Sequence, residues 1–344
     1  MYNVKFTPHR KILGTICDRQ TRGHEMVSLG GKYRFFIGDE IQEPDFWFVH
    51  GKGLSESETV RVAPANTVLM TTEPESVLIY PKRYTSQFGH VCTSQECIRH
   101  PHVILGPTIL PWYVGYNESD EDSQLVATLD YDILKSSEPH EKKKLISVIT
   151  SNKSFTQGHI DRISFVTKLK AHFGDSLDIF GRGFNAFDDK WSVLHDYRYH
   201  IVIENCSQPY YWSEKLGDCF LAETYPFYYG CTNLNDYFPD GSYTAIDIRN
   251  PEQAIRIIEE SIAQNTFEKS AGVLRECREL CLDRYNMFES MAAICDMLDP
   301  SLPKEDVTIN PCVSGQSLRN LWRYTVGRSY YNMKNRIVNG RGVL

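Results

Sequence analysis

Short apolar runs separated by polar turns dominate the first half of the 344-residue chain. The runs are rich in β-forming side chains and are closed by nearby glycine or proline, which is the pattern of strands. They cover residues 46–49, 67–71, 88–92 and 103–105. Because apolar residues show little helical spacing here, we expect this half to be built around strands.

From residue 145 onward, predicted strands and helices alternate. The strands are predicted at 145–150, 177–180, 200–203, 227–229 and 245–248, and the helices at 160–173, at 213–222 and from 251 onward. Asn250 has the features of an N-cap, with Pro251 at the first helical position. This alternation predicts a parallel sheet covered on both faces, with ligands bound beyond the carboxyl ends of its strands.

Two polar stretches rich in structure-breaking residues, 116–122 and 136–144, predict a domain boundary. We therefore expect domains at 1–140 and 141–300, followed by a separate segment at 301–344. That segment is basic from residue 311 onward and contains no acidic side chain there. An acidic body with a basic tail is an asymmetry that suggests a surface-binding or packing role for the tail.

Composition and charge narrow the class of protein. Hydrophobic residues make up 41% and charged residues 24%, as in a packed, water-soluble protein. A net charge of −7 argues against a nucleic-acid partner. The ten cysteines show no C-x-x-C spacing, and no long apolar run or signal peptide is evident. We therefore expect reduced cysteines and a cytoplasmic location, extending to the inner surface of a membrane.

Residues 197–230 carry the chemistry. A predicted buried strand delivers Glu204 and Asn205 at its carboxyl end, and a helix is predicted to open near Ser213 with Glu214 and Lys215 in its first turn. Free N–H groups at a helix start attract phosphate, a lysine adds a full charge, and a glutamate can accept hydrogen bonds from ribose hydroxyls. The segment suits a nucleoside diphosphate. A capped helix with a surface Glu–Lys pair is the alternative.

Three stretches here resemble the donor-binding signature of the α1,3/4-fucosyltransferases, glycosyltransferase family 10. They are Tyr199–Ser207, Tyr211–Leu216 and Pro226–Gly230, and the family pattern runs aromatic-x-Phe-Glu-Asn-Ser, Tyr-x-Thr-Glu-Lys-Leu and Pro-x-x-x-Gly. Ser151-Asn152 with Arg162, and residues 177–181, also fit, so the resemblance spans about 145–265. The departures are Ile203 for phenylalanine, Cys206 placed between Asn205 and Ser207, and Ser213 for threonine.

The resemblance implies a GT-B fold, in which two Rossmann-like domains face each other across a cleft. The first would be the acceptor-side domain and the second would bind GDP-fucose. It further implies an inverting, metal-independent transfer of fucose to a glycan hydroxyl, with an α1,3-type linkage and an oligosaccharide or lipid-linked glycan as acceptor. Position by position, Arg162 and Lys215 would neutralise the diphosphate and Tyr211 would hydrogen-bond it. Glu214 would face the ribose or the sugar, and Asn205 and Glu204 would complete the donor site.

An inverting transfer needs a base on the opposite side of the anomeric carbon from the leaving group, so we expect it to come from the first domain. Glu73 is the candidate because it follows a predicted strand and resembles a short Glu-containing segment of the family. Glu75 is the competitor. A solvated loop carboxylate is the alternative interpretation of Glu73.

Other signals are weaker. Asp130-Tyr131-Asp132 is a D-x-D pattern that can hold a divalent cation with a diphosphate, but it is common by chance. Gly181-Arg182-Gly183 lacks the third glycine of a dinucleotide motif and predicts a strand-to-loop turn. The histidines His159, His172 and His195 have no recognisable metal-ligand spacing.

The tail interleaves aromatic and basic residues from Leu318 to Lys334, which suits a helix lying on an anionic membrane. A last helix packing back on the first domain is the favoured alternative. For the whole chain, two further functions stay open: the same fold with another nucleotide-sugar donor, and a nucleotide- or glycan-binding relative without catalysis.

Overall fold

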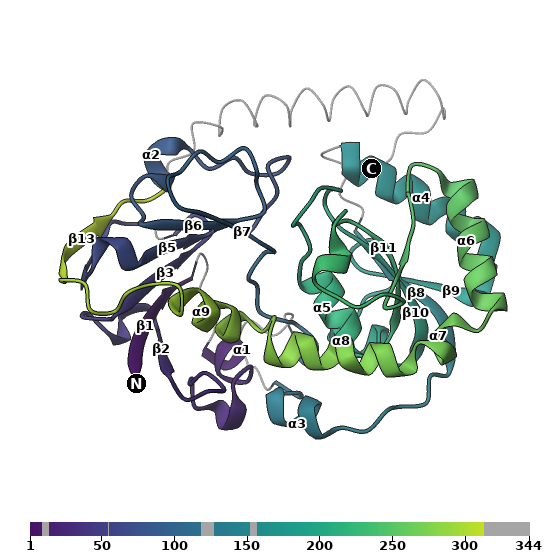
Figure 1. Ribbon diagram of the computed structural model, residues 1–344. Coiled ribbons are helices and arrows are strands. Elements are labelled where there is room, and N and C mark those ends of the chain that lie inside the picture. The colour runs from purple at the N-terminus through teal and green to yellow at the C-terminus, as the bar shows by residue number, and fades with distance from the viewer. Residues whose placement is uncertain (9–13, 54, 118–126, 152–156, 313–344) are drawn as a thin grey trace.

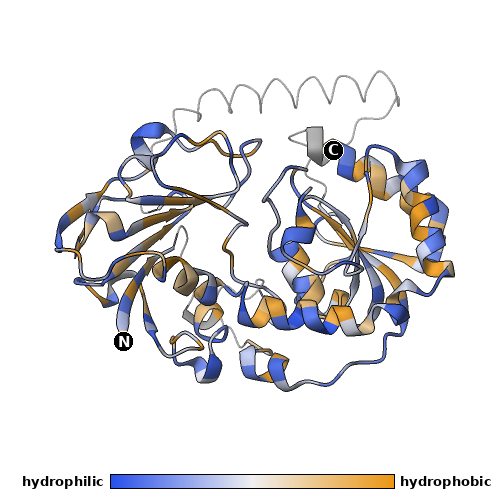
Figure 2. Cartoon of the chain, viewed as in Figure 1, coloured by the Kyte–Doolittle hydropathy of each residue, from blue (hydrophilic) through white to orange (hydrophobic). Residues whose placement is uncertain are grey.

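A computed structural model describes residues 1–8, 14–53, 55–117, 127–151 and 157–312. The described chain forms two α/β lobes, each built on a parallel sheet (Figure 1). Their central strands are hydrophobic, and the outer faces of the covering helices are hydrophilic (Figure 2). The expected α/β fold with two Rossmann-like sheets is confirmed.

The first lobe holds a six-stranded sheet in the order β2-β1-β3-β5-β6-β7, with all neighbours parallel. Its strands are β1 (Tyr2–Thr7), β2 (Tyr33–Ile37), β3 (Phe46–His50), β5 (Thr67–Met70), β6 (His90–Thr93) and β7 (Val103–Leu105). The short helices α1 (Gly14–Asp18) and α2 (Lys82–Thr85) also belong to this lobe. Strand β3 is buried throughout, as its run of aromatic and β-branched residues predicts.

The second lobe holds a five-stranded parallel sheet in the order β12-β11-β10-β8-β9. The strands are β8 (Lys144–Ile149), β9 (Leu177–Phe180), β10 (Tyr197–Ile203), β11 (Tyr225–Tyr229) and β12 (Thr244–Ala245). The helices around this sheet are α4 (Gln157–Phe173), α5 (Glu214–Leu221), α6 (Pro251–Ala263), α7 (Thr266–Lys269) and α8 (Ala271–Asp283). A single apolar core joins the central strands to α4, α5, α6 and α8.

After α8 the chain returns to the first lobe (Figure 1). Helix α9 (Met287–Cys295) buries Met287, Phe288 and Met291 in the core of the first lobe, where the Phe288 ring lies 4.8 Å from that of Phe35. Strand β13 (Glu305–Ile309) then pairs antiparallel with β4 (Glu58–Val62). The return therefore begins before residue 301, where the sequence placed the end of the second domain.

The predicted strands and helices of the second lobe lie within a few residues of their observed positions. Helix α4 starts at 157 instead of 160, and β12 covers two residues where four were expected at 245–248. Asn250 caps α6 as predicted, because its side chain accepts a hydrogen bond from the Gln253 N–H. The tail from 313 to 344 lies outside the described residues. Among the residues described, no helix is long and apolar enough to cross a membrane.

Candidate functional site

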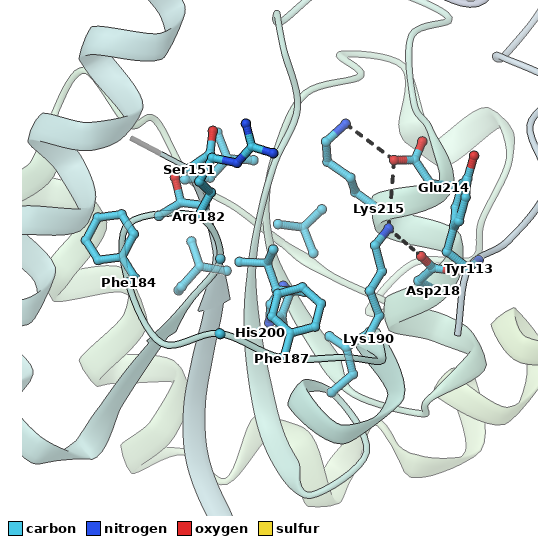
Figure 3. Close-up of a pocket in the computed structure, with 18 of the residues that line it drawn as sticks. Tyr113, Ser151, Arg182, Phe184, Phe187, Lys190, His200, Glu214, Lys215 and Asp218 are labelled. Carbon is cyan, nitrogen blue, oxygen red and sulfur yellow. Dashed lines mark hydrogen bonds and ion pairs between the residues drawn. The ribbon is translucent and has the colours of Figure 1, made fainter. Parts of the chain in front are cut away.

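A cavity of about 650 Å³ opens at the carboxyl ends of β8, β9 and β10 (Figure 3). This is the edge of a parallel sheet at which open α/β folds bind ligands. The first turn of α5, the Arg162 side chain of α4 and the loop after β9 complete its wall. It is larger than a single sugar needs and has the size typical of small-molecule sites.

Arg162 and Lys215, predicted from the sequence to act together, both line this cavity. The Arg162 guanidinium donates to Ser151 Oγ at 3.3 Å, and its Nε has no hydrogen-bond partner among the described residues. Burial lowers the pKa of Arg162. Burial also acts to lower the pKa of Lys215, but the neighbouring carboxylates of Glu204 and Glu214 outweigh it and raise that pKa. A guanidinium stays protonated in proteins and the pKa of Lys215 is raised, so the cavity wall carries two cations.

Lys215 is held in place by hydrogen bonds at the start of α5. Ser213 is the N-cap, and its backbone N–H and hydroxyl both donate to Glu204 Oε1 at 2.9 Å. Lys215 Nζ donates to Glu204 Oε2 at 3.1 Å. Glu204, predicted to bind the donor, is only 3% exposed and does not line the cavity. In the structure its carboxylate positions the helix start and Lys215.

Gly230, the glycine that ends the third matching stretch, leaves room for the Glu204 side chain. A Cβ at this position would lie 2.3 Å from the Tyr228 hydroxyl and 2.6 Å from Glu204 Cγ. Those contacts are too short for any side chain, so only glycine lets the Glu204 side chain pass. The matching stretches therefore contain residues that line the cavity, such as Lys215, and residues that hold these in place, such as Glu204 and Gly230.

Lys190, which belongs to no motif in the sequence, also lines the cavity. Its Nζ lies 2.8 Å from Asp218 Oδ2 and 3.9 Å from Glu214 Oε1. Lys215 Nζ is also 3.9 Å from Glu214 Oε1, so Glu214 lies between two lysines (Figure 3). Burial acts to raise the pKa of Glu214, but these two cations outweigh it and lower that pKa. Glu214 is therefore an ionised acceptor at the cavity wall.

Glu73 lies beside the cavity and comes from the first lobe. It is half-buried, and Asn205 Nδ2 donates to its Oε2 at 3.5 Å across the two lobes. The buried amide of Gln95 donates to the carbonyls of Glu73 and Leu78, which fixes the loop after β5. Burial raises the pKa of Glu73, although Lys215 opposes the effect. Glu75, the competing candidate, is exposed to solvent.

The remaining candidates are placed as follows. Asn205 follows β10 and reaches Glu73, as described above. Tyr211 is 1% exposed and is not among the residues lining the cavity, although it was expected to hydrogen-bond the diphosphate. Burial among the carboxylates of Glu204, Glu73 and Glu214 raises its pKa well above the usual value. Tyr211 thus lies beneath the site in this structure.

The loop Gly181–Asp188 after β9 forms one wall of the cavity. Gly181 has φ +115°, and a Cβ there would lie 1.9 Å from the Thr150 carbonyl oxygen. The loop is closed by hydrogen bonds from Gly181 N to Asn185 O and from Phe184 N to Gly181 O. The Gly-Arg-Gly sequence is the predicted turn, and it also places Arg182 and Phe184 at the cavity (Figure 3).

The D-x-D pattern has a local structural use. Asp130 is the N-cap of α3 (Tyr131–Ser136) and pairs with His24, and Asp132 accepts from the Gly23 N–H. Neither carboxylate lines the cavity described above.

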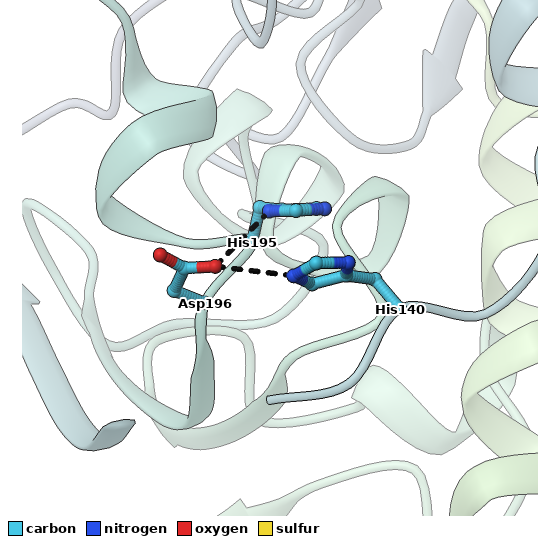
Figure 4. Close-up of side chains that lie close together, drawn as sticks. All are labelled: His140, His195 and Asp196. Carbon is cyan, nitrogen blue, oxygen red and sulfur yellow. Dashed lines mark hydrogen bonds and ion pairs between the residues drawn. The ribbon is translucent and has the colours of Figure 1, made fainter. Parts of the chain in front are cut away.

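A second cluster joins His195 to His140 and Asp196 (Figure 4). The two imidazole rings are stacked, with centroids 3.7 Å apart and planes 23° apart. A metal ion lies close to the plane of each imidazole that ligates it, and these nearly parallel planes do not converge on a nearby point. We therefore assign no metal to this cluster as it is arranged.

Comparison with known proteins found a family model and solved structures that are similar to this chain. Residues 139–266 match the C-terminal part of glycosyltransferase family 10 (fucosyltransferase). A crystal structure of an α1,3-fucosyltransferase with GDP is similar at 16% identity and a TM-score of 0.50, over 86% of this chain and 89% of that chain. Another, of an α1,3-fucosyltransferase with GDP-fucose, gives 16% identity and a TM-score of 0.47 over the same shares.

No curated protein sequence matches the chain. The similarity to the GDP-containing crystal structure establishes a common fold. The family match covers every residue that lines the cavity except Tyr113 and Tyr116, which lie in the segment 106–117 after β7, called the linker below. Residues 139–266, in the second lobe, therefore match the C-terminal part of glycosyltransferase family 10 (fucosyltransferase), within a chain that has the overall fold of an α1,3-fucosyltransferase.

Proposed function

We propose that this protein transfers fucose from GDP-fucose to a hydroxyl group of a glycan acceptor, with inversion at the anomeric carbon. One observation carries the proposal. Arg162 and Lys215 both line one cavity in the second lobe. Glu73 of the first lobe is not among the lining residues, but it accepts a hydrogen bond from Asn205 of the second lobe, and the charges of Lys215 and Glu214 act on its pKa. A cation pair for a departing diphosphate and a carboxylate on the opposite lobe are what such a transfer requires.

The reaction assigns one task to each group. The acceptor oxygen attacks the anomeric carbon as the bond from that carbon to the β-phosphate oxygen breaks, and GDP leaves with the bonding electrons. Arg162 and Lys215 stabilise the negative charge that develops on the β-phosphate. Glu73 takes the proton of the acceptor hydroxyl. The raised pKa of Glu73 makes its carboxylate a stronger base than an exposed glutamate.

The donor's ribose is assigned to Glu214. Its ionised carboxylate lies at the cavity wall between Lys190 and Lys215 and can accept hydrogen bonds from two hydroxyls. Because four cationic side chains already line the cavity, we propose that the transfer needs no metal ion; these are Arg162, Arg182, Lys190 and Lys215. Retention of full activity in excess chelator tests that point.

The acceptor and the location are proposed on sequence evidence. An oligosaccharide or lipid-linked glycan is the acceptor class that the family resemblance implies. A cytoplasmic location is proposed from the absence of disulfide-type cysteine spacing, and the aromatic and basic pattern of residues 318–334, which lie outside the described structure, offers contact with the inner membrane surface as the alternative to packing on the first domain. Binding of the full chain to anionic vesicles tests this contact.

Calorimetry with GDP, followed by GDP-fucose with a panel of glycan acceptors, separates the candidate functions. Binding of GDP and release of GDP during fucose transfer support the proposal. Binding of UDP or CDP sugars in preference to GDP-fucose selects the same fold with another donor. Binding of GDP without turnover on any acceptor selects a non-catalytic relative.

A further inference from the structure

Lys190 lies where the donor cavity meets the linker between the lobes. It begins the 3-10 turn Lys190–Val193, and its ammonium group is 5.0 Å from the centre of the Tyr113 ring. The same ammonium forms the contacts with Asp218 and Glu214 described above. One side chain therefore touches the cavity wall, helix α5 and the linker.

Asp218 carries the connection to the linker backbone. Its Oδ1 accepts hydrogen bonds from the N–H groups of Tyr113, at 2.8 Å, and Val114, at 3.3 Å. Its side chain is 1% exposed, so its negative charge is buried on α5. Burial raises the pKa of Asp218, and Lys190 is the first of the groups that oppose this effect. The Lys190 ammonium thus stabilises the Asp218 carboxylate, which accepts the hydrogen bonds from the linker backbone.

The residue before Lys190 holds the next part of the linker. Asp189 Oδ1 accepts from the Gly115 N–H at 2.8 Å and also from the Trp191 N–H at 2.8 Å. On the other side of the linker, the buried Arg19 donates to the carbonyls of Trp112 and Val114. The N–H groups of residues 113–115 are therefore held by the second lobe, while the carbonyls of Trp112 and Val114 and the Trp112 N–H are held by Arg19 and Gln20 of the first lobe.

We propose that Lys190 is a positioning residue that couples the donor site to the linker: it fixes the Glu214 carboxylate for the donor's ribose and stabilises Asp218 on the linker N–H groups. This inference rests on the proposed function, because it takes a nucleoside diphosphate as the ligand. Lys190 performs no proton transfer. It aligns Glu214 from one side while Lys215 aligns it from the other.

The test compares Lys190→Met, Lys190→Arg and a matched control. Removing the ammonium frees Glu214 on one side, so we expect GDP to bind about tenfold more weakly. The KM for GDP-fucose should rise by a similar factor while kcat changes little, because GDP and the donor share the ribose contact. Lys190→Arg should restore most of the affinity, since a guanidinium can pair with both carboxylates.

Lys144→Met is the control. Lys144 also pairs with an aspartate, Asp178 at 3.8 Å, and lies 5.1 Å from the Tyr197 ring, but it stands at the start of β8, at the other end of that strand from the cavity. It should bind GDP as the wild type does. If Lys190→Met does not fold because Asp218 is left unpaired, the double variant Lys190→Met/Asp218→Asn removes both charges and still tests Glu214.

The outcomes are distinct. Weakened GDP binding in the methionine variant, recovered with arginine, supports the inference. Wild-type affinity for GDP in a folded Lys190→Met or double variant overturns it and leaves the proposed function intact, since Arg162 and Lys215 are still present. Failure of the wild-type protein to bind GDP overturns the proposed function and this inference with it.

Discussion

The side-chain amide of Gln95 fixes the backbone position of Glu73, the candidate base. Its side chain is fully buried and donates to the carbonyls at both ends of the Glu73–Leu78 turn. The backbone of Glu73 is thereby fixed while its carboxylate remains half-buried at the junction of the lobes. Glu75, two residues later, has no such burial, and this difference favours Glu73 as the base.

Glu73→Gln should abolish fucose transfer and leave GDP binding nearly unchanged. The amide keeps the size and the hydrogen-bonding capacity of the side chain but cannot accept a proton. We expect kcat to fall by at least about a hundredfold, the usual contribution of a general base. Glu75→Gln is the control and should retain activity. Transfer at the wild-type rate by the Glu73→Gln protein would remove Glu73 from the mechanism.

The pH dependence of the reaction should show the raised pKa of Glu73. A base acts only when it is deprotonated, so kcat/KM should fall as the pH falls through that pKa. Because burial shifts the pKa upward, this loss should begin at a higher pH than an exposed glutamate would give. A pH profile of kcat/KM for wild type measures it, and a flat profile down to pH 4 would contradict the assignment.

At the scale of elements, the strand–loop–helix unit from β10 to α5 supplies Glu214 and Lys215 to the cavity, together with Glu204, which holds Lys215. Its sequence predicted both elements, because a buried apolar run, a serine N-cap and an apolar stripe are local signals. The same signals could not reveal that Glu204 turns inward to hold Ser213 and Lys215. Orientation of that kind depends on packing against β11 and Gly230.

Gly230→Ala should weaken both the fold and nucleotide binding. The new methyl group would overlap the Tyr228 hydroxyl and Glu204 Cγ, and overpacking of this kind costs about 1–3 kcal/mol. As Glu204 moves, Lys215 loses its buried partner and GDP affinity should fall. Chemical denaturation and calorimetry measure the two effects.

Gly217→Ala is the matched control for that substitution. No atom lies within 4 Å of a Cβ at Gly217 in the middle of α5, and alanine favours a helix over glycine by about 1 kcal/mol. It should be neutral or stabilising. Equal stability of the two alanine variants would show that Gly230 makes no close approach.

Lys190 marks the limit of motif-based prediction. It lies in an irregular segment between β9 and β10, outside the three matching stretches, and its partners come from α5 and from the linker. No spacing of residues along the chain predicts the contacts of Lys190 with α5 and the linker. In the sequence, a lysine that follows Asp189 at the start of a short turn is an ordinary surface pattern, and only the fold brings Asp218 against it.

At the scale of the whole molecule, the two lobes are held together by buried polar contacts. Arg19 is 0% exposed and donates to the carbonyls of Trp112, Val114 and Leu129, all of which lie between β7 and α3. Its guanidinium also lies 4.1 Å from the centre of the Trp112 ring. Burial lowers the pKa of Arg19 to about 10, which still leaves it charged at neutral pH.

Arg19→Met should destabilise the protein by about 3 kcal/mol or more, because it leaves three carbonyls without their donor in a buried setting. Loss of this link should also let the lobes move relative to each other, which small-angle scattering would record as a larger radius. Arg256→Met, on the exposed face of α6, is the control. Unchanged unfolding free energy in the Arg19 variant would contradict this role.

The sequence predicted two α/β halves but not which half receives α9. The apolar positions of 287–295 show that the helix is buried, but they carry no information on the partner surface. Strands β4 and β13 were missed for a similar reason: each is short and half-exposed, and they pair across a long sequence separation. Tertiary contacts decide on which lobe α9 packs and which strands pair, and the local sequence pattern does not contain them.

The return of the chain through α9 and β13 has a practical consequence for dividing the protein. A fragment that stops near residue 140 would lack a helix of its own hydrophobic core, and one that runs from 141 to 300 would carry that helix with its apolar face uncovered. Circular permutation that joins residue 344 to residue 1 and opens the chain near 140 would instead place residues 287–312 on the same uninterrupted stretch as the sheet they complete.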